Sequence, residues 1–166
     1  HQDLVTANFG TDNVSILLGT GNGTFAAAVN YATGDGPISL SLADLNNDGN
    51  IDMVINCIDA PAVVLKNNAP KKNHLALAFK GTGLNTNGIG AKAYLFSGSK
   101  IQYQQLMLTR GFASSSEPRL HFGLNDQASL DSVLIVWPNQ QCQLIKNVKP
   151  GELVARQEAA DNVFIY

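Results

Sequence analysis

The sequence predicts an all-β protein, and three observations lead to this fold class. Short runs of β-prone residues recur along the chain, clusters rich in Gly, Asn and Asp separate them, and no long window carries a helical apolar stripe. Apolar residues make up 45% of the 166 residues, which is enough for a packed core. The expected strands are residues 4–7, 14–18, 53–56, 63–65, 75–79, 91–96, 101–108, 130–137 and 163–166.

The first four of these runs contain an internal repeat. Asp-Leu-Val at residues 3–5, followed by residues 14–18, recurs as Asp-Met-Val at residues 52–54, followed by residues 62–65, with offsets of 49 and 47. A period of about fifty residues with several strands per unit is typical of propeller blades. We therefore expect a propeller-blade-like antiparallel β unit over residues 1–69.

A second β region begins at Pro70. Apolar and polar residues alternate with period two over residues 101–104, which places the apolar side chains on one face of a sheet. The runs on either side of this segment are expected to belong to the same region. We predict a β-sandwich or barrel-like domain over residues 70–160 and a strand-like tail over residues 161–166.

The composition favours a secreted β-protein. Charged residues make up only 14% of the chain and the formal net charge is -2, while 17 Asn and 9 Gln outnumber the 24 charged side chains (11 basic and 13 acidic). Such a chain lacks the broad basic surface that nonspecific nucleic-acid binding requires. No apolar stretch approaches the ~20 residues of a membrane-spanning helix, so no membrane span is predicted.

The charge is divided unevenly along the chain. Residues 1–65 hold seven Asp and no Lys or Arg, which gives -7, whereas residues 66–166 hold eleven bases and six acids, which gives +5. Such an asymmetry indicates two functional parts. The acidic first part is expected to attract cations.

The clearest candidate site is the nine-residue segment DLNNDGNID at residues 44–52. Oxygen-bearing side chains stand at its positions 1, 3, 5 and 9, and Gly stands at position 6, where the loop must turn with positive φ. Ca²⁺ takes about 6–8 oxygen ligands and tolerates irregular geometry. The predicted ligands are the side chains of Asp44, Asn46, Asp48 and Asp52 and the carbonyl of Asn50.

Other interpretations of this loop are weaker. An EF-hand needs a bidentate Glu at position 12, where this chain has Ile55, and the residues after the loop form a strand rather than a helix. A metal-free turn must tolerate three carboxylates within nine residues, which repel one another. Mg²⁺ is disfavoured because it loses its waters reluctantly. The sequence therefore predicts Ca²⁺ as the cofactor.

The same nine residues, followed by a hydrophobic strand, resemble the calcium loop of the FG-GAP/VCBS-type repeats of integrin-like β-propellers. Thr-Phe at residues 24–25 and YATGDGP at residues 31–37 resemble the stretch that precedes this loop. Residues 3–5 resemble the end of an earlier copy whose first ligands are missing, so Asp3 is not expected to bind metal. This resemblance covers residues 3–68 and implies a calcium-binding propeller blade.

Residues 73–153 resemble a different module. The motifs NHL (73–75), NGIGA (87–91), GFAS (111–114), EP (117–118), HFGL (121–124) and VWP (136–138) occur in the order found in ASPIC/UnbV domains. Ser115 stands where the family often has Gln, and Asn125 stands where Gly is common. These domains follow FG-GAP repeats in proteins similar to cartilage acidic protein. The resemblance implies an extracellular, calcium-linked setting and brings no established catalytic residues.

Two cysteines and two sequons are candidate modification sites. Cys57 and Cys142 fit neither a redox CxxC motif nor a zinc site, which leaves two buried thiols or one disulfide bridge. Asn13 and Asn22 each begin an Asn-X-Ser/Thr acceptor pattern for N-glycosylation.

Three further candidates are better explained without a functional role. His121 has no evident nucleophile or acid partner, so we interpret it as a hydrogen-bonded structural residue. The serine run at residues 114–116 is interpreted as a turn rather than as a nucleophile. Trp137 follows an apolar run and is expected to lie in the core rather than to stack on a sugar.

Two function classes follow. The first is a noncatalytic extracellular or cell-surface calcium-binding module for adhesion, matrix contact or assembly, and the alternative is a carbohydrate-binding accessory module. A lone blade leaves sheet edges unpaired, so we expect a homo-oligomer, a filament or ring formed by strand addition, or part of a longer propeller protein. A glycan or matrix component is the other expected partner. An enzyme is not expected.

Overall fold

The computed structural model describes residues 2–109, 111 and 114–157. These residues form β-strands and one short 3₁₀ turn, η1 (Phe9–Thr11), so the prediction of an all-β protein is confirmed. The expected strand at residues 163–166 and the tail over residues 161–166 lie outside the described residues. The chain divides into two compact units: residues 1–69 with 109–116, and residues 70–108 with 117–166.

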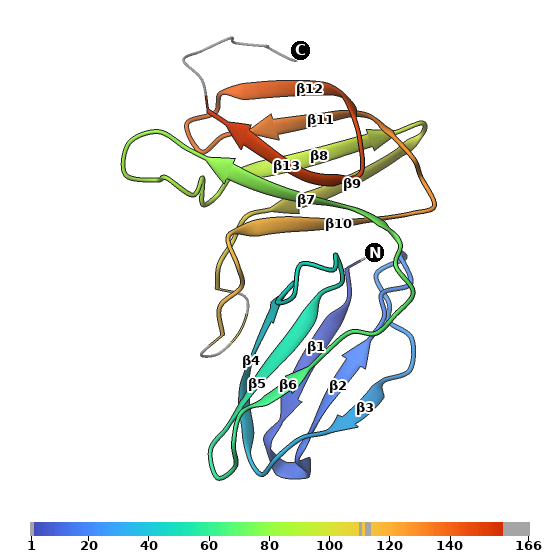
Figure 1. Cartoon of the computed structure of the whole chain (residues 1–166), viewed down its shortest axis with the longest axis vertical. Helices are drawn as coiled ribbons and strands as arrows, with labels where there is room; N and C mark the ends of the chain where they lie inside the picture. Colours follow the sequence, from blue (N-terminus) through green and yellow to red (C-terminus); the bar gives the residue numbers. More distant parts are fainter. Residues whose placement is uncertain (1, 110, 112–113, 158–166) are drawn as a thin grey trace. The chain divides into compact units, whose positions relative to one another are not determined.

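The first unit contains two three-stranded antiparallel sheets (Figure 1). In sheet order, the strands are β1 (Leu4–Asn8), β2 (Asn13–Leu17) and β3 (Val29–Ala32), then β4 (Pro37–Ala43), β5 (Asp52–Cys57) and β6 (Val63–Leu65). The pairs β1–β2 and β5–β6 are both antiparallel hairpins. The two copies of the sequence repeat therefore adopt the same local structure.

β3 and β4 are not among the strands expected from the sequence, for different reasons. All four residues of β3 are exposed, so this strand carries no buried face and depends on its pairing with β2. β4 alternates apolar residues with Ser39 and Ser41, which is a period-two pattern. The adjoining turn cluster at residues 33–37 obscures that pattern.

A small apolar core joins the two sheets of the first unit. Val14 of β2 and Met53, Ile55 and Cys57 of β5 are buried, and partly buried side chains from β1, β4 and β6 pack against them. Because β5 is the central strand of its sheet, it contributes three of the four buried side chains.

The serine run at residues 114–116 belongs to this first unit, although it is distant in sequence. The Leu40 N–H donates to Ser114 Oγ at 3.4 Å, and Ser41 Oγ donates to the Ser115 carbonyl. The run therefore contacts the free edge of β4, a structural role that sequence reasoning did not identify.

The described residues of the second unit form seven strands in two sheets (Figure 1). In sheet order, they are β10 (Arg119–Asn125), β7 (Asn73–Lys80) and β13 (Gly151–Arg156), then β12 (Cys142–Val148), β11 (Leu130–Val136), β8 (Lys92–Ser97) and β9 (Lys100–Gln105). β13 runs parallel to β7, and the other pairs are antiparallel. Neither sheet closes into a barrel within the described residues, so the unit is a sandwich rather than a barrel.

Both sheets of the second unit contribute to one core, and the buried side chains follow a period of two along the strands. Those on the first sheet include Leu75, Leu77 and Phe79 of β7 and Leu120, Phe122 and Leu124 of β10; those on the second include Ala93 and Leu95 of β8 and Val133 and Ile135 of β11.

Trp137 lies in this core, as predicted. It is only 2% exposed and meets Phe79 edge-on, with ring centroids 5.7 Å apart and an interplanar angle of 83°. A buried indole cannot stack on a sugar, so Trp137 gives no support to carbohydrate binding. Gly88 packs against both rings: a Cβ at this position would lie 2.8 Å from Phe79 Cβ and 3.2 Å from Trp137 Cζ3.

We predict that Gly88→Ala destabilises the second unit more than Gly98→Ala does. Both glycines have positive φ, 62° and 56°, so both variants carry the left-handed backbone cost. Only Gly88 also meets buried side chains, whereas nothing lies within 4 Å of a Cβ at Gly98. The free energies of unfolding, measured in urea, should differ by about 1–3 kcal/mol, the usual cost of overpacking. Equal losses would contradict the packing described around Trp137.

Candidate metal centre

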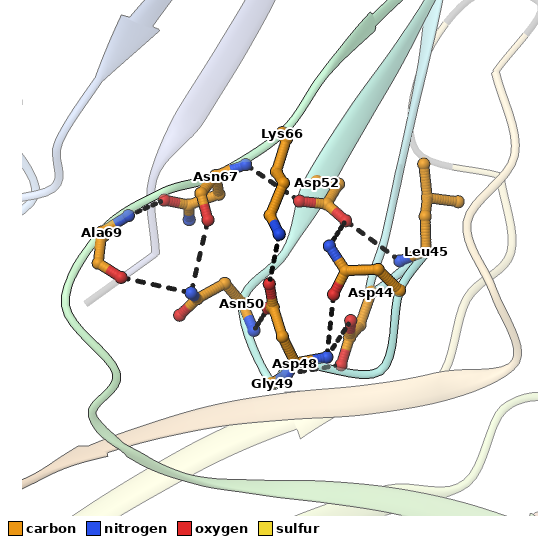
Figure 2. Close-up of polar contacts among 10 residues, drawn as sticks. Asp44, Leu45, Asp48, Gly49, Asn50, Asp52, Lys66, Asn67 and Ala69 are labelled. Atoms are coloured by element: carbon orange, nitrogen blue, oxygen red, sulfur yellow. Dashed lines mark hydrogen bonds and ion pairs between the residues drawn. The ribbon is translucent and has the colours of Figure 1, made fainter.

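The acidic loop, residues 44–51, connects β4 to β5, and Asp52 is the first residue of β5 (Figure 2). Asn47 and Gly49 have positive φ, 57° and 89°. Gly adopts such a conformation without a steric penalty, and Asn tolerates it better than most residues. These two residues let the loop reverse direction within a few positions, as the Gly at position 6 predicts.

Asp44 and Asn46 turn their side-chain oxygens toward the same backbone group. The Asp48 N–H donates to Asp44 Oδ1 at 3.1 Å and to Asn46 Oδ1 at 2.9 Å, and the Gly49 N–H donates to Asp44 Oδ2 at 2.8 Å (Figure 2). The oxygens at positions 1 and 3 therefore lie on the same side of the loop. Each of them keeps a second lone pair for another partner.

Asp48 carries a partly exposed carboxylate, with 32% of its side chain accessible to solvent. Its Oδ1 accepts the Asn50 N–H at 2.9 Å, and its Oδ2 lies 3.3 Å from Lys66 Nζ. The Asn50 N–H, followed by Lys66, lowers the pKa of the Asp48 carboxyl below its ordinary value. Asp48 therefore stays ionised at neutral pH.

Asp52 is buried, with only 2% of its surface exposed, and it connects three segments. Its Oδ2 accepts the Leu45 N–H at 3.2 Å and Asn46 Nδ2 at 3.3 Å, and its Oδ1 accepts the Asn67 N–H at 2.9 Å. A buried charge is costly unless such donors surround it. Asp52, the predicted metal ligand at position 9, is thus also a structural centre, because it holds the acidic loop and the segment after β6 against the start of β5.

The first copy of the repeat contains the same contact. Asp3 Oδ1 accepts the Gly19 N–H at 2.9 Å, as Asp52 Oδ1 accepts the Asn67 N–H at 2.9 Å. In each copy, an Asp before or at the start of the first strand receives the N–H of a residue just after the second strand. This contact belongs to the hairpin, because it is present at Asp3, where no metal ligand is expected.

The segment that follows β6 covers one side of the loop. Asn50 Nδ2 donates to the carbonyls of Asn67 and Ala69, each at 3.3 Å, and the Lys66 side chain reaches Asp48 (Figure 2). Residues 66–69 are therefore part of the candidate site. Sequence reasoning missed them because they lie fourteen or more positions after the loop and carry no ligand motif.

The donor chemistry fits a hard divalent cation. The candidate ligands Asp44, Asn46, Asp48, Asn50 and Asp52 offer only carboxylate, amide and carbonyl oxygens, which Ca²⁺ prefers. Among the described residues, no three His, Cys, Asp or Glu side chains are gathered as a metal-binding group. The calcium assignment accordingly stays a prediction that rests on the donor set.

The two cysteines lie in different units. Cys57 is buried in the first unit and Cys142 is partly exposed in the second, and both are free thiols. Cys57 packs in the small core of the first unit. The alternative of a Cys57–Cys142 bridge stays a prediction, which mass measurement before and after reduction decides.

The two sequons differ in their surroundings. Asn13 lies in β2, where its Oδ1 accepts Asn8 Nδ2 at 2.7 Å and its Nδ2 donates to the Thr11 carbonyl at 2.9 Å. Asn22 lies in an exposed turn, and its Oδ1 accepts the Thr24 N–H at 3.0 Å. Of the two, Asn22 presents the more accessible acceptor.

His121 is hydrogen-bonded, as predicted, but it has an acid partner that the sequence analysis did not find. Its Nε2 lies 2.5 Å from Glu117 Oε1, and Arg119 connects Glu117 to Glu152 through ion pairs of 3.7 Å and 3.0 Å. Residues four apart in an extended strand lie too far apart for such a bond. The tight turn in which the Arg119 N–H donates to the Glu117 carbonyl at 2.8 Å brings Glu117 back to His121.

Comparison with protein families assigns both parts of the chain. The family model described as ASPIC and UnbV matches residues 81–163, half of the chain. The chain belongs to the ASPIC and UnbV family. Residues 1–55 match the FG-GAP-like repeat, so both suspected modules are confirmed, in the expected order. No curated protein matches the chain.

The two modules together are those of an extracellular-type repeat protein, since FG-GAP repeats are typical of extracellular or cell-surface proteins. In the described part of this ASPIC/UnbV protein, no helix has the length and apolar character needed to cross a membrane.

We predict that Asp52→Ala destabilises the FG-GAP-like unit even without metal. The variant removes the carboxylate that accepts the backbone N–H groups of Leu45 and Asn67, and each hydrogen bond to a charged group contributes about 1.5–3 kcal/mol. Urea unfolding in the presence of a chelator measures the loss. Asp59→Ala, which removes an exposed Asp of the same unit, is the matched control and should change little. Similar losses in the free energy of unfolding in the two variants would show that the Asp52 contacts do not stabilise the loop.

Proposed function

We propose that this protein is a noncatalytic calcium-binding structural module of the extracellular or cell surface. The observation that carries the proposal is the convergence of the Asp44 and Asn46 oxygens on one backbone group, beside the accessible Asp48 carboxylate. Ca²⁺ bound there by Asp44, Asn46, Asp48, Asn50 and Asp52 would neutralise the most acidic part of the chain. It would act as a structural cross-link between the ends of β4 and β5.

The site favours Ca²⁺ over Mg²⁺. An octahedral Mg²⁺ requires near-ideal geometry at about 2.0–2.1 Å, whereas this loop offers donors of several kinds at irregular positions. The His121 cluster carries no competing catalytic proposal, because the neighbouring Glu117 and Glu152 are both engaged in ion pairs with Arg119.

Calcium should raise the melting temperature of the protein. A cation that binds only the folded state stabilises it by RT ln(1 + [Ca²⁺]/Kd), about 2.7 kcal/mol at one hundred times Kd. Differential scanning calorimetry of the full chain, with calcium and then with a chelator, measures this shift. Asp48→Ala should abolish it, while Asp59→Ala should retain it. An unchanged melting curve of the wild type in saturating calcium would remove the metal assignment.

We also propose that copies of the chain assemble by adding strands edge to edge. Among the strands that the structure describes, β3 pairs with β2 alone; its four residues are all exposed, and Val29 and Tyr31 are 53% and 46% exposed. Within the same described residues, β6 pairs with β5 alone, and its Val64 is 62% exposed. Addition of β3 from one copy to β6 of the next is a head-to-tail contact, which produces a ring or a filament.

Light scattering tests this assembly. The full chain at micromolar concentration should show a mass above the 17.7 kDa of one copy, and Val29→Lys with Tyr31→Lys should reduce it, because charged side chains oppose edge pairing. Leu84→Lys, at a fully exposed loop position of the ASPIC/UnbV domain, is the control. A monomeric wild type would end the proposal. The tail over residues 161–166, a second candidate contact, lies outside the described residues.

A further inference from the structure

Lys66 is the only Lys or Arg in residues 1–69, where seven Asp occur. Its Nζ lies 3.3 Å from Asp48 Oδ2, and the two side chains are 56% and 32% exposed (Figure 2). The one basic side chain of this stretch is therefore directed at the partly exposed Asp48 carboxylate of the candidate calcium loop.

The backbone holds Lys66 beside the loop. Leu65, the residue before it, pairs with Met53 in the β5–β6 ladder, and the N–H of Asn67, the residue after it, donates to Asp52 Oδ1 at 2.9 Å. The Cα of Lys66 is thus fixed on both sides, while its long stem leaves the ammonium free to move. The side chain is tethered within reach of Asp48 without being locked there.

The hairpin itself does not require a basic side chain at the position of Lys66. The contact of the Gly19 N–H with Asp3 is equivalent to the contact of the Asn67 N–H with Asp52. Leu18, the residue before Gly19, is therefore the counterpart of Lys66. Leu18 is apolar and 57% exposed, so the same hairpin forms with no charge there. The base is specific to the copy that carries the acidic loop.

We propose that Lys66 is a tethered counter-ion that competes with Ca²⁺ for Asp48 Oδ2 and so weakens the affinity of the loop for calcium. The inference rests on the proposed calcium function and adds to it a residue that regulates the site. Without metal, the ammonium offsets part of the repulsion among Asp44, Asp48 and Asp52. For Asp48 Oδ2 to bind Ca²⁺, the ammonium has to leave that oxygen, because two cations repel each other.

The expected effect is moderate, because both partners are partly exposed to water. Partly exposed ion pairs contribute little, so removal of the charge by Lys66→Gln should tighten calcium binding by about two- to fivefold. Lys66→Glu places a fourth carboxylate beside the loop and should tighten it further. Lys66→Arg keeps the charge and should retain the wild-type affinity. The difference between the wild type and Lys66→Gln should shrink at high salt, where exposed charges are screened.

Calorimetric titration of the full chain with CaCl₂ at low ionic strength tests the inference. The matched control is Lys72→Gln, which removes a comparable exposed Lys–carboxylate pair, Lys72 with Asp126 at 2.8 Å, in the other unit. Circular dichroism and melting in chelator verify that each variant is folded.

The outcomes separate the two proposals. Tighter binding by Lys66→Gln and Lys66→Glu, with unchanged binding by Lys66→Arg and Lys72→Gln, supports the competition. If the wild type binds calcium and Lys66→Gln binds it equally or more weakly, the role of Lys66 is overturned, while the proposal of calcium binding stands. If Lys72→Gln tightens calcium binding by the same factor, the effect comes from the net charge of the protein, and this result also overturns the role of Lys66. No calcium binding by the wild type or any variant overturns both proposals.

Discussion

The first unit depends on the buried carboxylate of Asp52. This single group accepts hydrogen bonds from the start of the acidic loop at Leu45, from the Asn46 side chain, and from the backbone of Asn67 after β6. A buried carboxylate without donors is strongly disfavoured, so the acidic loop, β5 and the segment after β6 can come together only in an arrangement that supplies such donors. These hydrogen bonds to Asp52 therefore help to set the shape of the loop.

Hydrogen bonds from backbone N–H groups to Asp carboxylates recur in the acidic unit. Asp3, Asp12, Asp44, Asp48 and Asp52 each accept at least one backbone N–H. A stretch with one base cannot balance its acids with ion pairs, and backbone N–H groups at turns supply most of the hydrogen bonds that these carboxylates accept instead. These bonds are directional, so each Asp fixes a particular turn, which a mobile surface ion pair does not do.

The two modules differ in how much core supports them. The ASPIC/UnbV domain buries side chains from both of its sheets around Trp137, whereas the apolar core of the FG-GAP-like unit has four buried side chains among the described residues. A small core contributes less hydrophobic free energy to folding. The hydrogen bonds around Asp52 accordingly matter more to the stability of the FG-GAP-like unit than any single polar contact does to the ASPIC/UnbV domain.

The features that local patterns encode were predictable. Period-two alternation and turn residues are properties of a few adjacent positions, so the sequence alone determined the all-β class, the strands β1, β2, β5 and β6 and the turn at Gly49. The core position of Trp137 followed from the apolar run before it. The order of the motifs also sufficed to identify both modules.

The tertiary structure decided what depends on partners distant in the sequence. β3 has no buried face and exists through its pairing with β2, and β13 runs parallel to β7, a pairing whose register no local pattern specifies. The bond between Glu117 and His121 needs a tight turn, and the pair of Lys66 with Asp48 needs the β5–β6 ladder. The sequence alone determined that Asp52 is a candidate ligand, but only the burial of its carboxylate among distant N–H groups makes it a structural centre, because solvation is set by the whole fold.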